Sequence, residues 1–326
     1  MIAPFPLSYL PSGIFGQSEA RLNFTGRRSE IFGKPTMMDL NSKDKSPGAA
    51  FLTTHKSNIA LWSGFVVVVF FCYHLFSDGD FSFLMTMGAF VRAFGFAFLI
   101  FKAFSQRSVA GLSLKTLELY AFVFLFRLSS ILRYQGYLPY DRSGDWLYSF
   151  LEIVALTLCC GVIYLVTMRF NSTYELRYDT FGWLHVPTEL GALYILLPCM
   201  FFGMLIHPNL NRNWFSDVSW TIALYIEAVA ILPQLFMFQK RGGGAVESCI
   251  SHFVYALAFG SFLHLVFWFS SYHELGEKDA GQHVGYAVIF VQIGHMLMMA
   301  DFLYYYFKSM KEGGPMMLPT HGAYQA

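Results

Sequence analysis

The chain has 326 residues, of which 55% are hydrophobic and only 13% are charged, and its formal net charge is +1. Since about a quarter of the residues in a typical soluble domain are charged, this composition excludes an ordinary globular enzyme and makes a lipid bilayer the expected solvent. Nucleic acid is excluded as a partner, because the Lys and Arg residues are scattered between apolar runs instead of clustered.

The N-terminal region is polar and is interrupted by prolines and glycines, which predicts a mostly disordered cytosolic extension over residues 1–57. A cleaved signal peptide is not expected, because the positive n-region is missing and the first long apolar run starts near Asn58. That run, residues 58–77, predicts a first transmembrane helix.

Seven further apolar segments are each long enough, or nearly so, to cross a bilayer. They cover residues 82–101, 114–132, 147–168, 186–206, 218–238, 250–270 and 284–307. Because unpaired backbone groups cannot face lipid, all eight segments are predicted helices, and the expected fold class is an all-α membrane protein.

Basic residues are distributed unequally between the two sets of loops that these helices define. One set holds Lys102, Arg107, Lys115, Arg169, Arg177, Lys240, Arg241, Lys308 and Lys311. The other holds fewer bases, Arg133, Arg142, Arg212 and Lys278, among several acidic residues. The first set and both termini are therefore expected in the cytosol, and the second set in the lumen. Asn171 begins an N-x-T sequon, but this topology places it in a cytosolic loop, where no glycan is expected.

Two strings carry a family resemblance. Residues 102–132, KAFSQRSVAGLSLKTLELYAFVFLFRLSSIL, resemble the first cytosolic loop and second helix of KDEL receptors. Residues 225–240, YIEAVAILPQLFMFQK, are nearly the family's own string. The resemblance covers about residues 82–319, so we expect a receptor-like domain over 82–312, a cytosolic tail over 313–326, and in 58–77 a helix additional to the family's usual seven.

The resemblance implies a seven-helix fold related to SWEET and PQ-loop proteins, built from two three-helix repeats. It also implies a receptor that binds the C-terminal tetrapeptide of lumenal cargo proteins and returns them from the Golgi to the endoplasmic reticulum membrane. Lys308 and Lys311 are candidates for engaging the COPI coat. The sequence has no catalytic motif and implies no cofactor and no metal. A PQ-loop or SWEET-type small-solute transporter is the alternative, and a diverged member without a peptide ligand is a third possibility.

Four residues are candidate ligand contacts by resemblance. Arg127 matches the arginine that grips the ligand's terminal carboxylate, although a purely structural ion pair is an alternative. Asp217 matches the acid that receives the ligand's lysine, with Trp220 as its neighbour, and its alternative is a solvated loop aspartate. Trp268 matches a cavity tryptophan, or else is an aromatic anchor at the interface.

Four more residues are candidate switch or interhelical polar residues. Glu227 corresponds to a family glutamate that helps to transmit a pH-driven change, and Asp301 to an aspartate needed for transport; a static interhelical hydrogen bond is the alternative for both. Arg92 stands where the family has a pH-sensing histidine, so switching by that position is lost. We hypothesise that His264 takes part of that role, against the alternative of a satisfied interhelical histidine.

Several positions depart from the family pattern. Arginines that read acidic ligand residues and the carboxylate are replaced by Met85, Ser261 and Ser271. Other cavity residues have become Leu128, Ser130 and Gly260. Each lost charge-assisted hydrogen bond costs about 1.5 to 3 kcal/mol, so the ligand is expected to differ from a standard doubly acidic tetrapeptide.

Overall fold

The computed structural model describes residues 83–134, 146–183, 187–210, 213–241, 245–273 and 283–318, with five isolated positions between 60 and 71. Every described residue belongs to the unit Phe51–Ala326. The predicted extension over 1–57, most of the predicted helix over 58–77 and the end of the tail lie outside the described residues.

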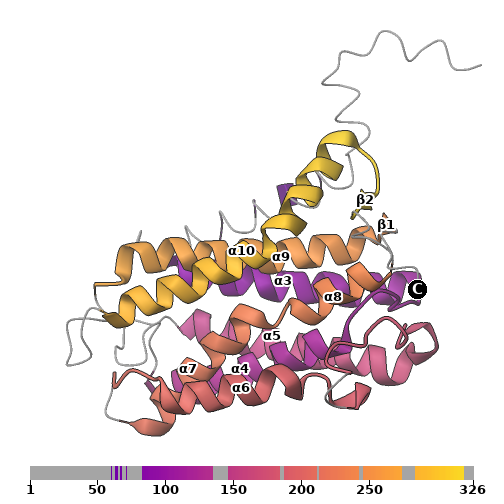
Figure 1. Cartoon of the computed structure of the whole chain (residues 1–326). Helices are drawn as coiled ribbons and strands as arrows, with labels where there is room; N and C mark the ends of the chain where they lie inside the picture. Colours follow the sequence, from indigo (N-terminus) through magenta and orange to yellow (C-terminus); the bar gives the residue numbers. More distant parts are fainter. Residues whose placement is uncertain are drawn as a thin grey trace, which may run out of the picture. The chain divides into compact units, whose positions relative to one another are not determined.

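The described residues form a bundle of helices that lie roughly side by side (Figure 1). The helices are α3 (Phe83–Gln106), α4 (Leu114–Tyr134), α5 (Trp146–Tyr164), α6 (Leu193–Leu205), α7 (Trp214–Val229), α8 (Leu232–Lys240), α9 (Ser248–Ser271) and α10 (His283–Glu312). A π-helical turn, η2 (Leu165–Arg169), extends α5, and η3 (Asn171–Thr173) and η4 (Thr188–Leu190) are short 3-10 turns. Each of the seven apolar segments predicted after residue 82 contains helix, which confirms a helical bundle for the described part of the chain.

Five of the described helical stretches are long and apolar enough to cross a membrane: Phe83–Gln106, Trp146–Arg169, Trp214–Lys240, Ser248–Ser271 and His283–Glu312. The helix α4 is not among them, because it contains charged residues such as Lys115 and Arg127, both of which are buried. The helix α6 has 13 residues and so spans about 20 Å, which is shorter than the prediction over 186–206.

A proline interrupts the span that runs from Trp214 to Lys240. Pro233 has no N–H to donate to the carbonyl of Val229 four residues earlier, and Ala230 and Ile231 leave the helix between α7 and α8. The sequence-based segment over 218–238 is therefore two helices in line instead of one.

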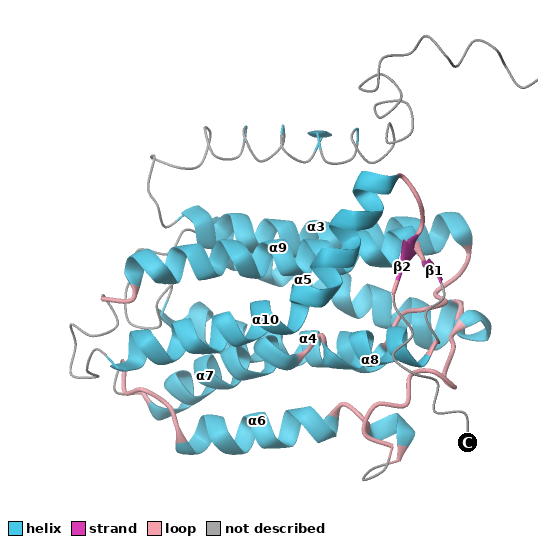
Figure 2. Cartoon of the chain, turned by 45° about the horizontal axis from the view of Figure 1, so that its top comes forward, coloured by secondary structure: helices cyan, strands magenta, loops and turns pink. Residues whose placement is uncertain are grey.

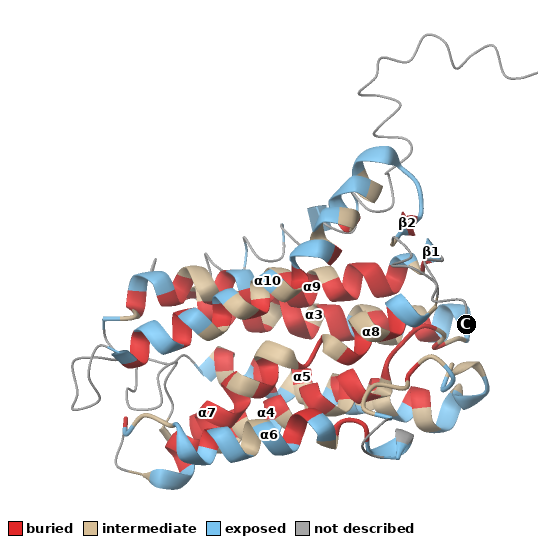
Figure 3. Cartoon of the chain, viewed as in Figure 1, coloured by how far each residue is buried: buried red, intermediate tan, exposed pale blue. Residues whose placement is uncertain are grey.

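The helices pack in pairs around buried faces. The helix α3 packs against α9 and α5, α4 packs against α7 and α5, and α10 covers α9 and α7 (Figures 1 and 2). Phe96 of α3 makes edge-to-face contacts with Phe124 of α4 and Phe253 of α9. Figure 3 shows buried residues on the inner faces and exposed ones outside. Many of the exposed side chains are large and apolar, such as Phe201 and Phe290, which suits lipid better than water.

The end of α10 is tied back to the start of α9 by a short antiparallel pair of strands, β1 (Ala245–Val246) and β2 (Met316–Met317). Ala245 pairs with Met317 and Val246 with Met316, and Met316 is buried. The first part of the predicted tail over 313–326 is thus fixed against the bundle.

Candidate functional site

Four charged side chains meet in the interior of the bundle. Arg92 of α3 contacts Glu227 of α7 and lies 3.0 Å from Glu152 of α5. Arg127 of α4 contacts the second oxygen of Glu227, and its Nη1 lies 3.4 Å from Glu152 Oε1. At most 8% of any of the four residues is exposed. We call these four residues the charge cluster; its two guanidiniums and two carboxylates leave it neutral.

Two glycines make room for the cluster where α3 and α9 meet. A Cβ atom on Gly260 would lie 3.0 Å from the carbonyl oxygen of Gly88 and 3.5 Å from Cγ of Arg92. A Cβ atom on Gly88 would collide with the ring of His264. The two helices can therefore approach closely, and the space that a larger residue at 260 would fill holds the Arg92 side chain.

His264 lies beside the cluster. Its Nε2 atom is 3.4 Å from Nη2 of Arg92, and because a guanidinium only donates hydrogen bonds, Nε2 is the acceptor in this contact. The ring is buried between α3 and α9. His264 therefore faces a permanent cation.

The candidate ligand contacts fall into two places. Arg127 is in the cluster, where both of its η nitrogens contact carboxylates. Asp217 lies in the first turn of α7, ten residues and about 15 Å along the axis from Glu227. It is buried, which rules out a solvated loop aspartate. Near it, Trp220 packs edge to face on Trp268, with ring centroids 6.0 Å apart.

Asp301 is separate from the cluster. It is exposed on α10 and lines a cavity of about 100 Å³ with Leu235 and Phe238 of α8 and Leu318 of the tail. The structure does not bring this predicted switch residue together with Arg92, Glu227 and His264.

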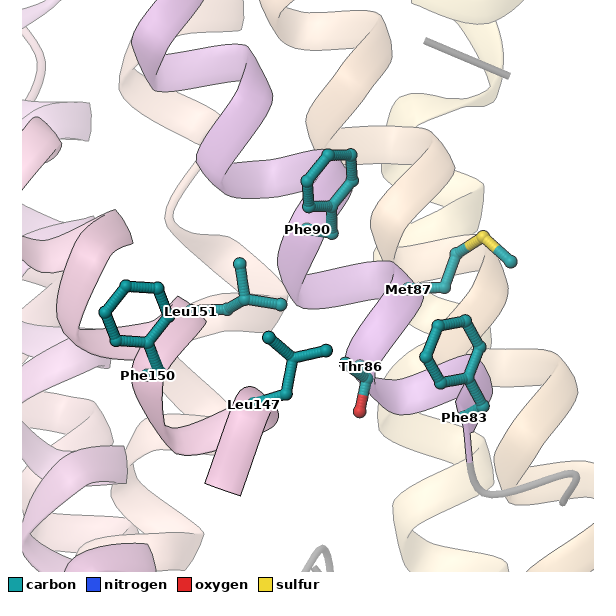
Figure 4. A pocket seen from close by; sticks show the side chains of 7 residues that line it. All are labelled: Phe83, Thr86, Met87, Phe90, Leu147, Phe150 and Leu151. Atoms are coloured by element: carbon teal, nitrogen blue, oxygen red, sulfur yellow. The ribbon is translucent and has the colours of Figure 1, made fainter. Parts of the chain in front are cut away.

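A larger cavity, of about 200 Å³, lies between the first turns of α3 and α5 (Figure 4). It is lined by Phe83, Thr86, Met87, Phe90, Leu147, Phe150 and Leu151. The lining is apolar except for Thr86, and Phe150 is exposed on the outer face of the bundle. Since none of the eight predicted site residues lines it, this cavity is not the predicted ligand site.

Two buried polar residues of this region were missed by the sequence analysis. Glu152 interrupts the apolar run over 147–168, and the rule that drew attention to Glu227, an ionisable residue at membrane depth, could have found it. His295 of α10 donates from Nδ1 to the carbonyl oxygen of Ala228 at 2.7 Å. It thereby satisfies a carbonyl next to the helix break before Pro233.

At the opposite end of α4, Asp179 caps the helix from a loop. Its carboxylate accepts hydrogen bonds from the Leu114 N–H at 2.8 Å, the Ser113 hydroxyl at 2.9 Å and the Tyr174 hydroxyl at 2.7 Å. Burial raises the pKa of Tyr174, and the adjacent carboxylate raises it further, so the hydroxyl stays protonated as a donor. Lys115 also contacts Asp179.

Pro233 and Gln234, which lie in the string over residues 225–240, are at the start of α8, and Gln234 is hydrogen-bonded to the loop that precedes α4. The Gln234 side chain accepts from the Ser113 N–H at 2.9 Å and donates to the Gly111 carbonyl at 2.8 Å. Its own N–H donates to the Thr116 hydroxyl at 3.0 Å. Gln234 therefore ties the start of α8 to the start of α4.

Comparison with known proteins identifies the family. Residues 108–271 match the family model of the ER lumen protein retaining receptor. ER lumen protein-retaining receptor B of Arabidopsis thaliana is 32% identical over 226 residues, 68% of this chain and 92% of the relative. The ER lumen protein-retaining receptor of Drosophila melanogaster is 29% identical over 70% of this chain and 95% of the relative. Receptor 2 of Homo sapiens is 28% identical over 68% and 92%. The chain therefore belongs to the ER lumen protein-retaining receptor, or KDEL receptor, family.

Proposed function

We propose that this protein is a receptor that binds the C-terminal retention signals of lumenal proteins of the endoplasmic reticulum and returns them from the Golgi. The family of the chain is a family of receptors, which supports this function. A receptor function also accords with a sequence that has no catalytic motif. The family supports a location in the endoplasmic reticulum membrane with cycling to the Golgi, and the helices that are long and apolar enough to cross a membrane fit it.

The spacing of Arg127 and Asp217 carries the proposal. Arg127 lies at the level of Glu227, and Asp217 lies about 15 Å further along α7, toward the predicted lumenal end. Four extended residues span about 13 to 14 Å, so a tetrapeptide could place its carboxylate near Arg127 and its first side chain near Asp217. Trp220 and Trp268 lie on the Asp217 side of this interval.

Ligand entry requires a change in packing. Met85, Leu128 and Leu224 belong to the same buried cluster as the two tryptophans. A peptide that reaches Arg127 must therefore displace apolar side chains between α4, α7 and α9. The proposed ligand-bound form is therefore more open than this structure, in which Arg127 and Asp217 are both buried.

The specificity in this proposal differs from that of a receptor for a doubly acidic signal. Met85, Ser261 and Ser271 are buried where the family resemblance implies arginines. Without these cations an Asp or Glu in the ligand would be desolvated without a partner, which is costly. We propose a signal with fewer acidic residues.

Two finer features belong to the same proposal. The contact of Gln234 with Gly111 and Ser113 supports a SWEET or PQ-loop-like arrangement of two three-helix repeats, because corresponding loop segments meet there. Lys308 and Lys311 are exposed at the end of α10, where the COPI coat could bind them from the cytosol.

The test is peptide binding to the purified full-length receptor at pH about 6 and about 7.4, with peptides that end in varied tetrapeptides. Arg127→Ala should abolish binding, because a desolvated carboxylate would lose its guanidinium partner. Arg133→Ala is the matched control, since Arg133 lies on the same helix but is exposed. Binding that survives Arg127→Ala would contradict the assignment.

A small-solute transporter is the second candidate. The observation in its favour is the charge cluster itself, since paired ionisable residues inside a membrane bundle also occur along transport pathways. Uptake of a solute into proteoliposomes, together with no binding of any tetrapeptide, would decide for the transporter.

A further inference from the structure

The two buried arginines already have carboxylate partners within the chain. Glu227 uses both oxygens, one for Arg92 and one for Arg127. Glu152 uses Oε1 for both, at 3.0 Å to Arg92 Nη2 and 3.4 Å to Arg127 Nη1. Arg92 and Arg127 thus form a carboxylate-binding site that the side chains of Glu152 and Glu227 already fill.

Glu152 is the less firmly held of the two acids. Its Oε2 atom is buried and has no hydrogen-bond partner among the described residues. One of its two contacts, at 3.4 Å, is long for a charge-assisted hydrogen bond. A carboxylate with an unsatisfied oxygen in a dry interior pays a desolvation cost that its contacts only partly recover. Glu152 is therefore the acid that another carboxylate could replace most easily.

Charge balance makes this replacement selective. The cluster is neutral as it stands, so a ligand carboxylate added to it would bring an uncompensated negative charge into a medium of low dielectric. If the charge of Glu152 were absent, the cluster would carry one net positive charge, and the same carboxylate would restore neutrality.

We propose that Glu152 is an internal counter-ion that occupies the arginine pair in place of the terminal carboxylate of the ligand and so determines affinity and specificity for that carboxylate. This inference rests on the proposed function, because it concerns the same Arg127 site. Glu152 acts through Arg127 and Arg92, and it is a specificity-determining residue that need not touch the peptide.

The experiment compares two probes that differ only at the terminus: a peptide ending in Lys-Asn-Gln-Leu with a free carboxylate, and the same peptide with a C-terminal amide. Affinities are measured on the full-length receptor, on Glu152→Gln and on the double variant Arg92→Gln/Glu152→Gln. Glu152→Gln should bind the free carboxylate at least about tenfold more tightly, the size of one charge-assisted hydrogen bond, and the amide no more tightly. The double variant, whose cluster is neutral again but lacks one guanidinium of the arginine pair, should lose the gain in affinity for the free carboxylate that Glu152→Gln alone gives.

The outcomes separate this inference from the proposed function. If the unaltered receptor binds in an Arg127-dependent way and Glu152→Gln gains no preference for the free carboxylate, the inference falls and the receptor function stands. Equal gains for carboxylate and amide also overturn it, because they show a general loosening of the bundle. If neither protein binds either probe or any other tetrapeptide, both fall.

If Glu152→Gln does not fold, a second variant, Glu152→Asp, tests the inference. Glu152→Asp keeps the charge but withdraws the carboxylate by one methylene, which weakens its hold on both arginines. It should shift the ratio of carboxylate to amide affinity in the same direction by a smaller factor. An unchanged ratio in a folded Glu152→Asp receptor would overturn the inference.

Discussion

At the scale of single residues, the main feature is a set of permanent charges buried without solvent. Arg92 is buried, and its neighbours Glu152 and Glu227 compensate its charge. Burying such charges costs several kcal/mol for each ion, and the mutual contacts recover that cost only while every member is present. Removing one partner is therefore much worse than replacing the whole set.

Glu227→Gln is predicted to lower the free energy of unfolding by about 3 to 5 kcal/mol, because it leaves two guanidiniums to share Glu152. Thermal unfolding of the purified receptor in detergent measures this. Glu312→Gln, an exposed change at the end of α10, should stay within about 0.5 kcal/mol. Equal melting temperatures for both variants would show that the cluster does not hold the bundle together.

His264 is the residue through which a pH response could still act, because the family's sensing position now holds Arg92. The charged groups near it are Arg92 from α3 and, through the cluster, Glu227 from α7, Arg127 from α4 and Glu152 from α5. We predict that His264→Phe makes peptide affinity equal at pH about 6 and about 7.4. A ratio of affinities that is unchanged in the variant would dispose of this role.

At the scale of elements, the seam between α3 and α9 decides where the cluster sits. Gly88 and Gly260 bring the two backbones close enough for Arg92 to extend beneath α9 toward Glu152 and Glu227. A larger residue at either position would push the helices apart and move the guanidinium. The close packing of α3 on α9 therefore also determines the position of the Arg92 side chain.

Gly88→Ala is predicted to destabilise the receptor by about 1 to 3 kcal/mol, because the new methyl group would overlap the His264 ring. Gly294→Ala is the matched control, since a Cβ atom there would meet nothing within 4 Å. That control should be neutral or slightly stabilising, as alanine is the better helix former. The melting temperatures of the two variants in detergent provide the comparison, and equal values would argue against a tight seam.

At the scale of the whole molecule, the distribution of basic residues among the loops predicts an orientation in the membrane. The basic loops precede α4, follow α5 and α8, and end α10, all at one end of the antiparallel bundle. Asn171 lies at this predicted cytosolic end, so its sequon should carry no glycan. The Arg127 site would then be reached from the opposite, lumenal end.

Thiol labelling can test this orientation. Lys311→Cys should react with a membrane-impermeant maleimide in intact microsomes, whereas Lys278→Cys should react only after the membrane is permeabilised. The native cysteines serve as the background in the unaltered protein. Labelling of Lys278→Cys in intact vesicles, or a glycan on Asn171, would reverse the topology and with it the lumenal access to Asp217.

The linear sequence was enough to find the helices and the family. Long apolar runs are dictated locally, because each must satisfy its own backbone in lipid, and α3, α5, α9 and α10 begin within two residues of the predicted starts. The break at Pro233 is equally local, since it follows from one missing N–H. The strings around Arg127 and Glu227 identified the family that the comparisons confirm.

The partners of the buried charges could not be read in the same way. Arg92 meets Glu152 across 60 residues and Glu227 across 135, and nothing in the local sequence links these positions. Their meeting depends on how closely α3 approaches α9 and on which faces of α4, α5 and α7 turn inward. Lipid exposure selects residue types along one helix, whereas the pairing of charges is a property of several packed helices. The sequence could single out Glu152 as a buried acid, but only the folded bundle shows that its partners are Arg92 and Arg127.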